Sequence, residues 1–228
     1  TWVFSDVSFR SKSIKRSQEY GSYVMENILF KISFPAEFHA QTAVEAGIFL
    51  HEKYGNKLDK ISKIEVETQE PAVRIISKTG PLHNYADRDH CLQYMIAIAL
   101  IYGKVEARHY QDEIASNHMI DALREKMIIS ENPKFSKDYL DPSKRSIANS
   151  ITLFFDDGSK SEKIRVEYPV GHRNRRDEGI PLLINKFKDA IKSYYPSNQS
   201  DDILNSFLDM ENLSNMSVNK MMDKLIIK

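Results

Sequence analysis

The stretch "SIANSITLFFDDGSKSEKIRVEYPVG" (146–171) predicts a β-hairpin. Apolar residues alternate with their neighbours in two runs, and Asp157-Gly158 lies between the runs. The alternating residues are Ile151, Leu153 and Phe155 in the first run and Ile164, Val166 and Tyr168 in the second. A period of two is typical of strands, and Asp-Gly is a strong signal for a hairpin turn. The stretch "ISKIEVET" (61–68) has the same period, so we expect a half-buried strand there as well.

Helical patterns surround these strands. From Pro35, apolar residues recur at helical spacing until Tyr54-Gly55-Asn56, where we expect the helix to end. The stretch "RDHCLQYMIAIALIYG" (88–103) is apolar almost all round after Gln93, which predicts a buried helix that stops at Gly103. "MIDALREKMII" (119–129) predicts a short helix that passes into a strand near 126–131.

The C-terminal part of the chain is helical in pattern from about residue 181 to the end. Strands mixed with helices, followed by helices alone, indicate the α+β fold class. The helical flanks are too short to form a core of their own, so we expect them to complete a helical domain that lies mostly upstream. The expected helices are 181–195, 200–210 and 217–226. The expected divisions are 1–30 as a linker or remnant of the helical domain, 31–178 as the α+β domain, and 179–228 as C-terminal helices that pack on the helical domain.

The composition excludes several classes of protein. Lysine plus arginine and aspartate plus glutamate number 32 each, so the net charge gives no reason to expect a nucleic-acid or membrane partner. No apolar run approaches the ~20 residues that span a bilayer. Cys91 is the only cysteine, which excludes an intramolecular disulfide and fits a reducing, cytoplasmic location. An iron–sulfur cluster normally needs several cysteine ligands, so this chain cannot hold one in the usual way.

Four long runs of the sequence resemble the MmgE/PrpD family, and the similarity covers essentially the whole chain. The runs are "YGSYVMENILFKISFPAEFHAQTAVEA", "GPLHNYADRDHCLQYMIAI", "DPSKRSIANSITLFFDDG" and "VEYPVGHRNRRDEGIPLLINKF". The resemblance implies the C-terminal portion of such a protein. That portion is a smaller mixed α/β sandwich domain, flanked by helices that belong to a large all-α domain mostly absent from this sequence. It also suggests a homodimer.

The resemblance implies a lyase that needs no cofactor and no metal. The expected reaction removes water from 2-methylcitrate to give 2-methyl-cis-aconitate, a step of propionate breakdown in the methylcitrate cycle. Related members decarboxylate cis-aconitate or epimerise dicarboxylic acids, so cis-aconitate decarboxylation and aconitate hydration remain alternatives. A truncated, non-catalytic remnant is the third alternative, because half of a cleft rarely catalyses. The upstream helical domain, in the same chain or as a separate subunit, is therefore an expected partner, and the isolated chain is expected to be inactive.

A tricarboxylate substrate sets the chemistry of the site. Water elimination needs a base for a weakly acidic C–H proton, an acid for the leaving hydroxyl, and positive charge beside the carboxylate. Arginine binds a carboxylate bidentately and so suits that last role. Aconitase uses an iron–sulfur cluster to remove the hydroxyl. With one cysteine, this chain has to rely on protein side chains.

Three residues are the catalytic candidates. By resemblance, Lys31 of the "FK…FPA" segment faces the active site, although a strand lysine can also lie with its stem over apolar neighbours. Tyr94 matches an active-site tyrosine of the decarboxylase branch, although a buried tyrosine with a satisfied hydroxyl is the alternative. His90 lies four residues before Tyr94, so one helix would place both on the same face. The alternative for His90 is a helix-end histidine bonded to the backbone.

Four residues are the substrate-binding candidates. Arg88 lies near the start of the predicted buried helix, and His39 lies in the first turn after Pro35. Where the decarboxylase branch has a histidine after "FPA", this chain has Glu37, which weakens the case for decarboxylation and leaves His39 an indirect candidate. His172 and Arg173 lie in the basic loop "GHRNRRDEG" (171–179), for which a solvated charge run at a domain junction is the alternative.

The other histidines and the cysteine are expected to have no catalytic role. His51, His109 and His118 have no partner at the spacing of metal ligands, so we expect surface or capping positions for them. Cys91 is expected to fill space in a buried helix.

Overall fold

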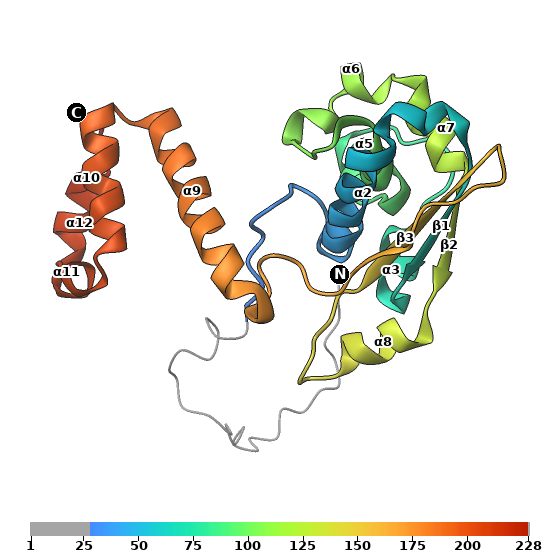
Figure 1. The fold of residues 1–228 in the computed structure, drawn as a ribbon. Helices are drawn as coiled ribbons and strands as arrows, with labels where there is room; N and C mark the ends of the chain where they lie inside the picture. Colours follow the sequence, from blue (N-terminus) through green and yellow to red (C-terminus); the bar gives the residue numbers. More distant parts are fainter. Residues whose placement is uncertain (1–27, 228) are drawn as a thin grey trace, which may run out of the picture.

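The computed structural model describes residues 28–227, which form an α+β body and a helical arm at the C-terminus (Figure 1). The body has one sheet of four strands in the order β2-β1-β3-β4. The strands are β1 (Ile61–Thr68), β2 (Met127–Glu131), β3 (Asn149–Phe155) and β4 (Ile164–Val166). Strand β1 is parallel to β2 and antiparallel to β3, and β3 is antiparallel to β4. The predicted hairpin is therefore confirmed, with a shorter second strand, and so is the α+β class.

Strand β1 has the expected alternation. Ile64, Val66 and Thr68 are buried, and the residues between them are partly exposed. The register shifts between Ile61 and Lys63, so Ile61 also reaches the core although three positions separate it from Ile64. One face of the sheet thus supplies an apolar surface for helices.

Two helices lie at the centre of the body, α2 (Gln41–Tyr54) and α5 (Leu92–Tyr102). Helix α2 packs against α5 and against strands β3 and β4. In α5 every residue from Leu92 to Leu100 is buried, which confirms the predicted buried helix, and Gly103 ends it with a left-handed φ of 64°. The remaining helices of the body are α3 (Glu70–Ile76), α4 (Tyr85–Asp89), α6 (Asp112–Ala115), α7 (His118–Glu125) and α8 (Pro133–Leu140), with 3-10 turns η1 (Phe38–Ala40), η2 (Gly55–Lys60), η3 (Ala107–Tyr110) and η4 (Arg173–Arg175).

The start of α5 differs from the prediction. Helix α4 ends at Asp89, His90 has φ −112° and ψ 26°, and Cys91 is extended at φ −120° and ψ 109°. The expectation that His90 and Tyr94 share one helix face is therefore wrong. The side chain of Asn84 caps the separate helix α4 by accepting a hydrogen bond from the backbone N–H of Asp87. Because of this cap, the residues just before α5 form the separate short helix α4.

The C-terminal arm consists of α9 (Arg176–Tyr194), α10 (Ser197–Leu208), α11 (Met210–Asn215) and α12 (Val218–Lys224). Figure 1 shows α10, α11 and α12 side by side at the far end of α9, away from the sheet. Helix α9 begins five residues before the expected position of 181, and Pro181 lies inside it. None of the helices between residues 28 and 227 has both the length and the apolarity to cross a bilayer.

The arm exposes many large apolar side chains. They are Ile180, Leu182, Tyr194, Leu208, Met210, Val218, Met222, Ile226 and Ile227. Scattered exposed apolar residues are common on proteins, but this number along one short segment indicates a surface made for contact.

The arm is joined to the body at a tight junction. The backbone N–H of Phe30 donates to the carbonyl oxygen of Gly171 over 3.2 Å. A Cβ atom at Gly171 would lie 1.6 Å from the carbonyl oxygen of Phe30, so only glycine fits there. Arg175 makes a bidentate pair with Glu45 of α2, with both N–O distances at 2.8 Å. These contacts fix the start of α9 against the body.

The packing of α2 on α5 depends on Gly47. Replacing Gly47 by alanine should destabilise the protein by about 1–3 kcal/mol, the usual cost of overpacking, although alanine is the better helix former. The added Cβ would lie only 2.8 Å from the Cβ of Ala99. Thermal or denaturant unfolding measures the loss. The matched control is Gly47→Ala combined with Ala99→Gly, which transfers the methyl group between the helices and should recover most of the stability. A double variant no more stable than Gly47→Ala would rule out this contact as the cause.

Candidate functional site

Glu37 and His39 form a carboxylate–imidazole pair at the entry to α2. Glu37 Oε1 lies 2.8 Å from His39 Nδ1, and Glu37 Oε2 accepts the backbone N–H of His39 at 2.8 Å. Because a carboxylate only accepts, Nδ1 carries the proton of the neutral ring. Burial alone would raise the pKa of Glu37, but hydrogen bonds and charge from His39, with a contribution from His90, hold it below its ordinary value of 4.5. The imidazole is thus held in one tautomer.

Asp89 and His90 form a second pair of the same kind. His90 Nδ1 lies 2.6 Å from Asp89 Oδ1, and the His90 side chain is 51% exposed. The backbone N–H of Glu37 donates to the carbonyl oxygen of Asp89 over 3.2 Å, which joins the two pairs. We call Glu37, His39, Asp89 and His90 the imidazole cluster. It brings together two imidazoles, each beside a carboxylate.

Tyr139 extends this cluster from a distant part of the chain. Its hydroxyl lies 3.2 Å from His39 Nε2, and the two rings are 5.7 Å apart. Since Nδ1 of His39 carries the proton, the tyrosine donates to Nε2. The result is a chain of hydrogen bonds from a carboxylate through an imidazole to a phenol, as in proton relays.

The stability of the cluster should depend on pH through Glu37. A carboxylate with a lowered folded pKa stabilises the fold above its unfolded pKa and loses this effect as pH falls through the folded value. We therefore expect the wild-type free energy of unfolding to fall more steeply below pH 4.5 than that of Glu37→Gln. Urea unfolding at several pH values measures the difference. Glu113→Gln, at an exposed site on α6, is the control and should follow the wild type. Parallel curves for wild type and Glu37→Gln would contradict the assignment.

Arg88 and Tyr94 line a hollow of about 400 Å³. We call it the arginine hollow. The other residues that line it are Leu82, His83, Asp112, Ala115, Ser116, Asp121 and Arg124. Arg88 Nη1 donates to the carbonyl oxygen of Tyr110 at 2.6 Å, and Nη2 pairs with Asp112 Oδ1 at 2.6 Å. The structure therefore brings together two of the predicted site residues, one from each side of the break at His90.

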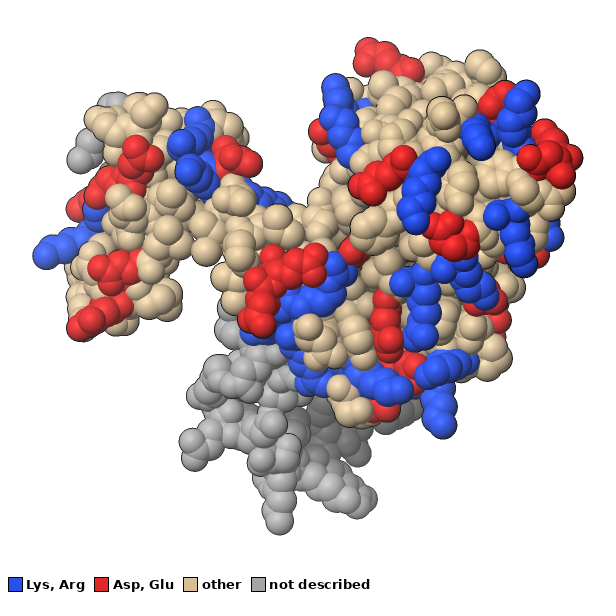
Figure 2. Space-filling view, viewed as in Figure 1, with Lys and Arg blue, Asp and Glu red and all other residues tan. Residues whose placement is uncertain are grey.

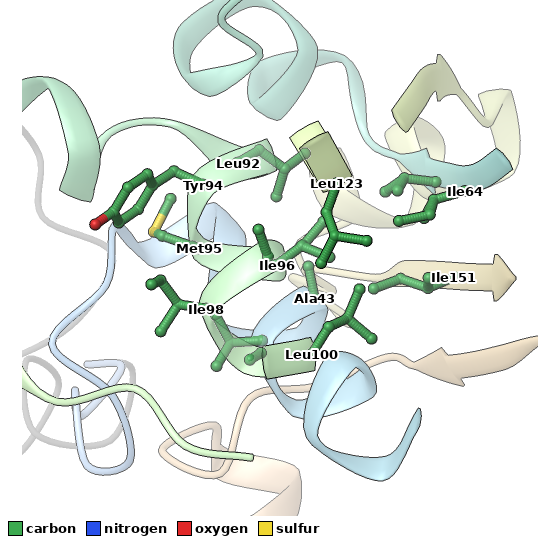
Figure 3. Close-up of a cluster of buried hydrophobic side chains, with 14 of the residues drawn as sticks. Ala43, Ile64, Leu92, Tyr94, Met95, Ile96, Ile98, Leu100, Leu123 and Ile151 are labelled. Carbon is green, nitrogen blue, oxygen red and sulfur yellow. The ribbon is translucent and has the colours of Figure 1, made fainter. Parts of the chain in front are cut away.

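Tyr94 is deeply packed at the edge of this hollow. Its hydroxyl donates to the carbonyl oxygen of His109 over 2.6 Å, and burial raises the pKa of Tyr94 to about 12. Figure 3 shows the ring at the margin of the buried apolar cluster, with its hydroxyl pointing away from Ile96 and Leu123. The Tyr94 hydroxyl is therefore protonated at neutral pH and hydrogen-bonded to the backbone. This is the buried tyrosine described above as the alternative to a catalytic role.

Lys31, His172 and Arg173 lie elsewhere, at the junction with the arm. Lys31 is exposed, and its carbonyl oxygen accepts from Lys186 Nζ at 2.8 Å. His172 is buried with its ring centroid 4.4 Å from that of Tyr168, and burial lowers its pKa. The guanidinium of Arg173 donates to the carbonyl oxygens of Pro142 and Ser143. These three residues do not line the arginine hollow.

The histidines and the cysteine that were expected to have no catalytic role occupy capping, surface or buried positions. His51 Nδ1 donates to the carbonyl oxygen of Leu100 at 2.7 Å and so caps the end of α5. His109 Nδ1 accepts the backbone N–H of Glu106 at 3.0 Å, and His118 is exposed. Cys91 is fully buried. Among residues 28–227 no group of three or more histidine, cysteine, aspartate or glutamate side chains could hold a metal ion.

Two functional candidates, Tyr139 and Arg124, were not predicted from the sequence. Tyr139 is 100 residues from His39, and only the fold brings them together. Arg124 lies on α7 in a pattern typical of an amphipathic helix. Figure 2 shows basic and acidic side chains mixed over the visible face, so charge alone does not distinguish Arg124 from the other arginines.

The sequence profile described as "MmgE/PrpD C-terminal domain" matches residues 34–211. The 2-methylcitrate dehydratase of Escherichia coli K12 is 51% identical over 229 residues, which cover 99% of this chain and 47% of the relative. The mitochondrial 2-methylcitrate dehydratase of Yarrowia lipolytica is 51% identical over 231 residues, or 100% and 44% of the two chains. The 2-methylcitrate dehydratase of Cupriavidus necator is 48% identical over 230 residues, which cover 100% of this chain and 48% of the relative.

The match extends over nearly all of this chain, but the chain spans about half the length of the curated relatives it matches. The part matched by the profile includes the whole sheet, the imidazole cluster and the arginine hollow. On this evidence the chain belongs to the MmgE/PrpD family.

Proposed function

We propose that this chain forms the C-terminal portion of a 2-methylcitrate dehydratase, a lyase that removes water from 2-methylcitrate to give 2-methyl-cis-aconitate. The main support is about 50% identity along the whole chain to proteins that carry this name. The imidazole cluster adds chemical support, because two imidazoles, each held by a carboxylate, suit proton removal and proton delivery.

His90 is the proposed base. Asp89 holds Nδ1 with its proton, so Nε2 is free to take the C–H proton beside a carboxylate. The electron pair of that bond forms the carbon–carbon double bond as the hydroxyl leaves. A second group then gives a proton to the hydroxyl, so that water departs. The proposed donor is His39 in its imidazolium form, in which Nε2 also carries a proton that it gives to the hydroxyl and Glu37 balances the charge of the ring. This role is in addition to its predicted role in substrate binding.

Positive charge for the three carboxylates comes from Arg88 and from Lys31 at the junction. Lys31 and Tyr94 remain proposed catalytic residues, and His172 and Arg173 remain proposed substrate ligands. For Tyr94, such a role requires its hydroxyl to leave the carbonyl oxygen of His109. For His172, the buried ring would have to turn from Tyr168. The geometry supports His90 and Arg88 most directly.

An upstream helical domain is the proposed partner. The large apolar side chains exposed along α9–α12 support this, because a helical domain packed on them would bury them. Such a domain would also provide the second wall of a cleft, where small molecules commonly bind. A homodimer and a cytoplasmic location complete the proposal.

The decisive experiment compares this chain alone with the same chain joined to the N-terminal half of the Escherichia coli relative. We expect no water elimination from 2-methylcitrate by the chain alone, and turnover by the joined protein, followed through the absorbance of the unsaturated product. Release of CO₂ from cis-aconitate would assign decarboxylation instead. A folded, joined protein without either activity would favour a non-catalytic remnant.

A further inference from the structure

The arginine hollow contains two buried guanidinium groups. The side chains of Arg88 and Arg124 are 8% and 9% exposed, and both line the same hollow of about 400 Å³. That volume lies in the range of small-molecule sites, which is about 300–1,000 Å³. Burying a positive charge is costly unless it is paired, so two such groups at one hollow need an explanation.

Each guanidinium is held in the same way. On one side a backbone carbonyl oxygen accepts from it, that of Tyr110 for Arg88 at 2.6 Å and that of Gly80 for Arg124 at 2.8 Å. On the other side an aspartate from α6 or α7 pairs with it, Asp112 with Arg88 and Asp121 with Arg124. The carbonyl oxygens fix the cations to the body, while the aspartates are their anionic partners.

The side chains of Asp112 and Asp121 can turn away from the arginines into solvent. The side chain of Asp112 is 88% exposed and that of Asp121 is 63% exposed, so both can rotate into water at little cost. The guanidiniums, in contrast, cannot leave without losing their backbone contacts. An entering carboxylate would therefore replace the aspartates and not the arginines.

Two buried donors near the hollow also lack partners. Arg124 Nε and the hydroxyl of Tyr110 make no hydrogen bond with the residues that the structure describes. Tyr110 lines a neighbouring hollow that shares His83, Arg88 and Asp112 with the arginine hollow. A buried donor without a partner is costly, and ligands or water normally satisfy it.

From these observations we propose that the arginine hollow binds a di- or tricarboxylate, with one carboxylate on Arg88 and another on Arg124 in place of Asp112 and Asp121. With both aspartates displaced, the two guanidiniums present two positive charges to the ligand. Arg124 thereby becomes a second carboxylate ligand beside Arg88. The proposal deepens the proposed function, on which the identity of the physiological ligand rests, but the binding itself does not depend on turnover.

The test measures citrate binding to the full 228-residue chain by titration calorimetry at constant ionic strength. Asp112→Asn and Asp121→Asn each remove a competing anion, so each should tighten binding about two- to fivefold. Arg124→Gln should weaken it more than tenfold, since a buried charged ligand is lost. The matched control is Arg74→Gln with Glu70→Gln, which changes an exposed ion pair on α3 and should leave affinity unchanged.

The aspartate variants keep the test decisive even if Arg124→Gln fails to fold. Unchanged or weaker citrate binding in both Asp112→Asn and Asp121→Asn would overturn the proposal. So would equal affinity for acetate, or inorganic phosphate binding as tightly as citrate, because neither has carboxylates for both arginines. Citrate binding without turnover in the joined protein would leave this proposal intact and refute the lyase. Turnover without the aspartate effect would do the reverse.

Discussion

Replacing His90 by glutamine in the joined, active protein should lower kcat for water elimination by about 10²- to 10⁴-fold, the usual contribution of a positioned acid or base. Glutamine keeps a hydrogen-bonding side chain near Asp89 but cannot take a proton from carbon. The His90 side chain is 51% exposed, and its Nδ1 lies 2.6 Å from Oδ1 of the adjacent Asp89. The change should therefore leave the fold intact. Initial rates at saturating 2-methylcitrate measure the effect, and circular dichroism checks the fold.

Two companion variants make this result specific. Asp89→Asn should reduce kcat less than His90→Gln does, because Asp89 orients the imidazole without touching substrate. His118→Gln removes an exposed histidine outside the imidazole cluster and should leave kcat unchanged. A fully active His90→Gln enzyme would remove His90 from the reaction and would direct attention to bases in the upstream half.

The second large effect is expected at the junction. Gly171→Ala should destabilise the α+β body by about 3 kcal/mol, the upper end of the cost of overpacking. A methyl group there would lie 1.6 Å from the carbonyl oxygen of Phe30, and a backbone atom cannot turn aside as a flexible side chain can. The segment at Phe30 or the loop at Gly171 therefore has to move. Denaturant unfolding measures the loss of stability.

The control for Gly171→Ala is Gly158→Ala, in the hairpin turn. Gly158 has φ of 82° and open space around it, so alanine there costs about 1–2 kcal/mol from backbone strain without any clash. We also expect Gly171→Ala, but not Gly158→Ala, to increase protease cleavage next to Arg175 as the start of α9 loosens. Equal losses in both variants, with no new cleavage, would show that the close approach to Phe30 is not important.

Much of the fold could be predicted because its signals are local. The alternation in 61–68 depends on neighbouring residues, and so does the Asp157-Gly158 turn. The end of α5 at Gly103 follows from one residue that tolerates a positive φ. The break at His90 could not be predicted in this way, because "RDHCLQYM" has no glycine or proline to mark it.

The candidate site was harder to predict because most of its contacts are not local. His39 and Tyr139 are far apart in sequence, and so are Arg88 and Tyr110. Histidine and arginine could be selected by the chemistry that a tricarboxylate requires, which made His90 and Arg88 candidates. The same reasoning gives Arg124 no preference over the other arginines, since burial beside a hollow is a property of the folded chain.

The place of β1 in the middle of the sheet has a consequence for synthesis on the ribosome. Val66 pairs with Ile129 on one side and with Ile151 on the other, so both neighbours of β1 are translated after it. At ordinary elongation rates, on the order of ten seconds pass between the synthesis of β1 and the synthesis of its second neighbour, β3. Until α5 and the two neighbouring strands have been made, apolar residues of β1 and α2 lack packing partners and are available to chaperones. Slow codons between 69 and 148 would lengthen this exposure, and codon choice there should govern how much protein escapes aggregation.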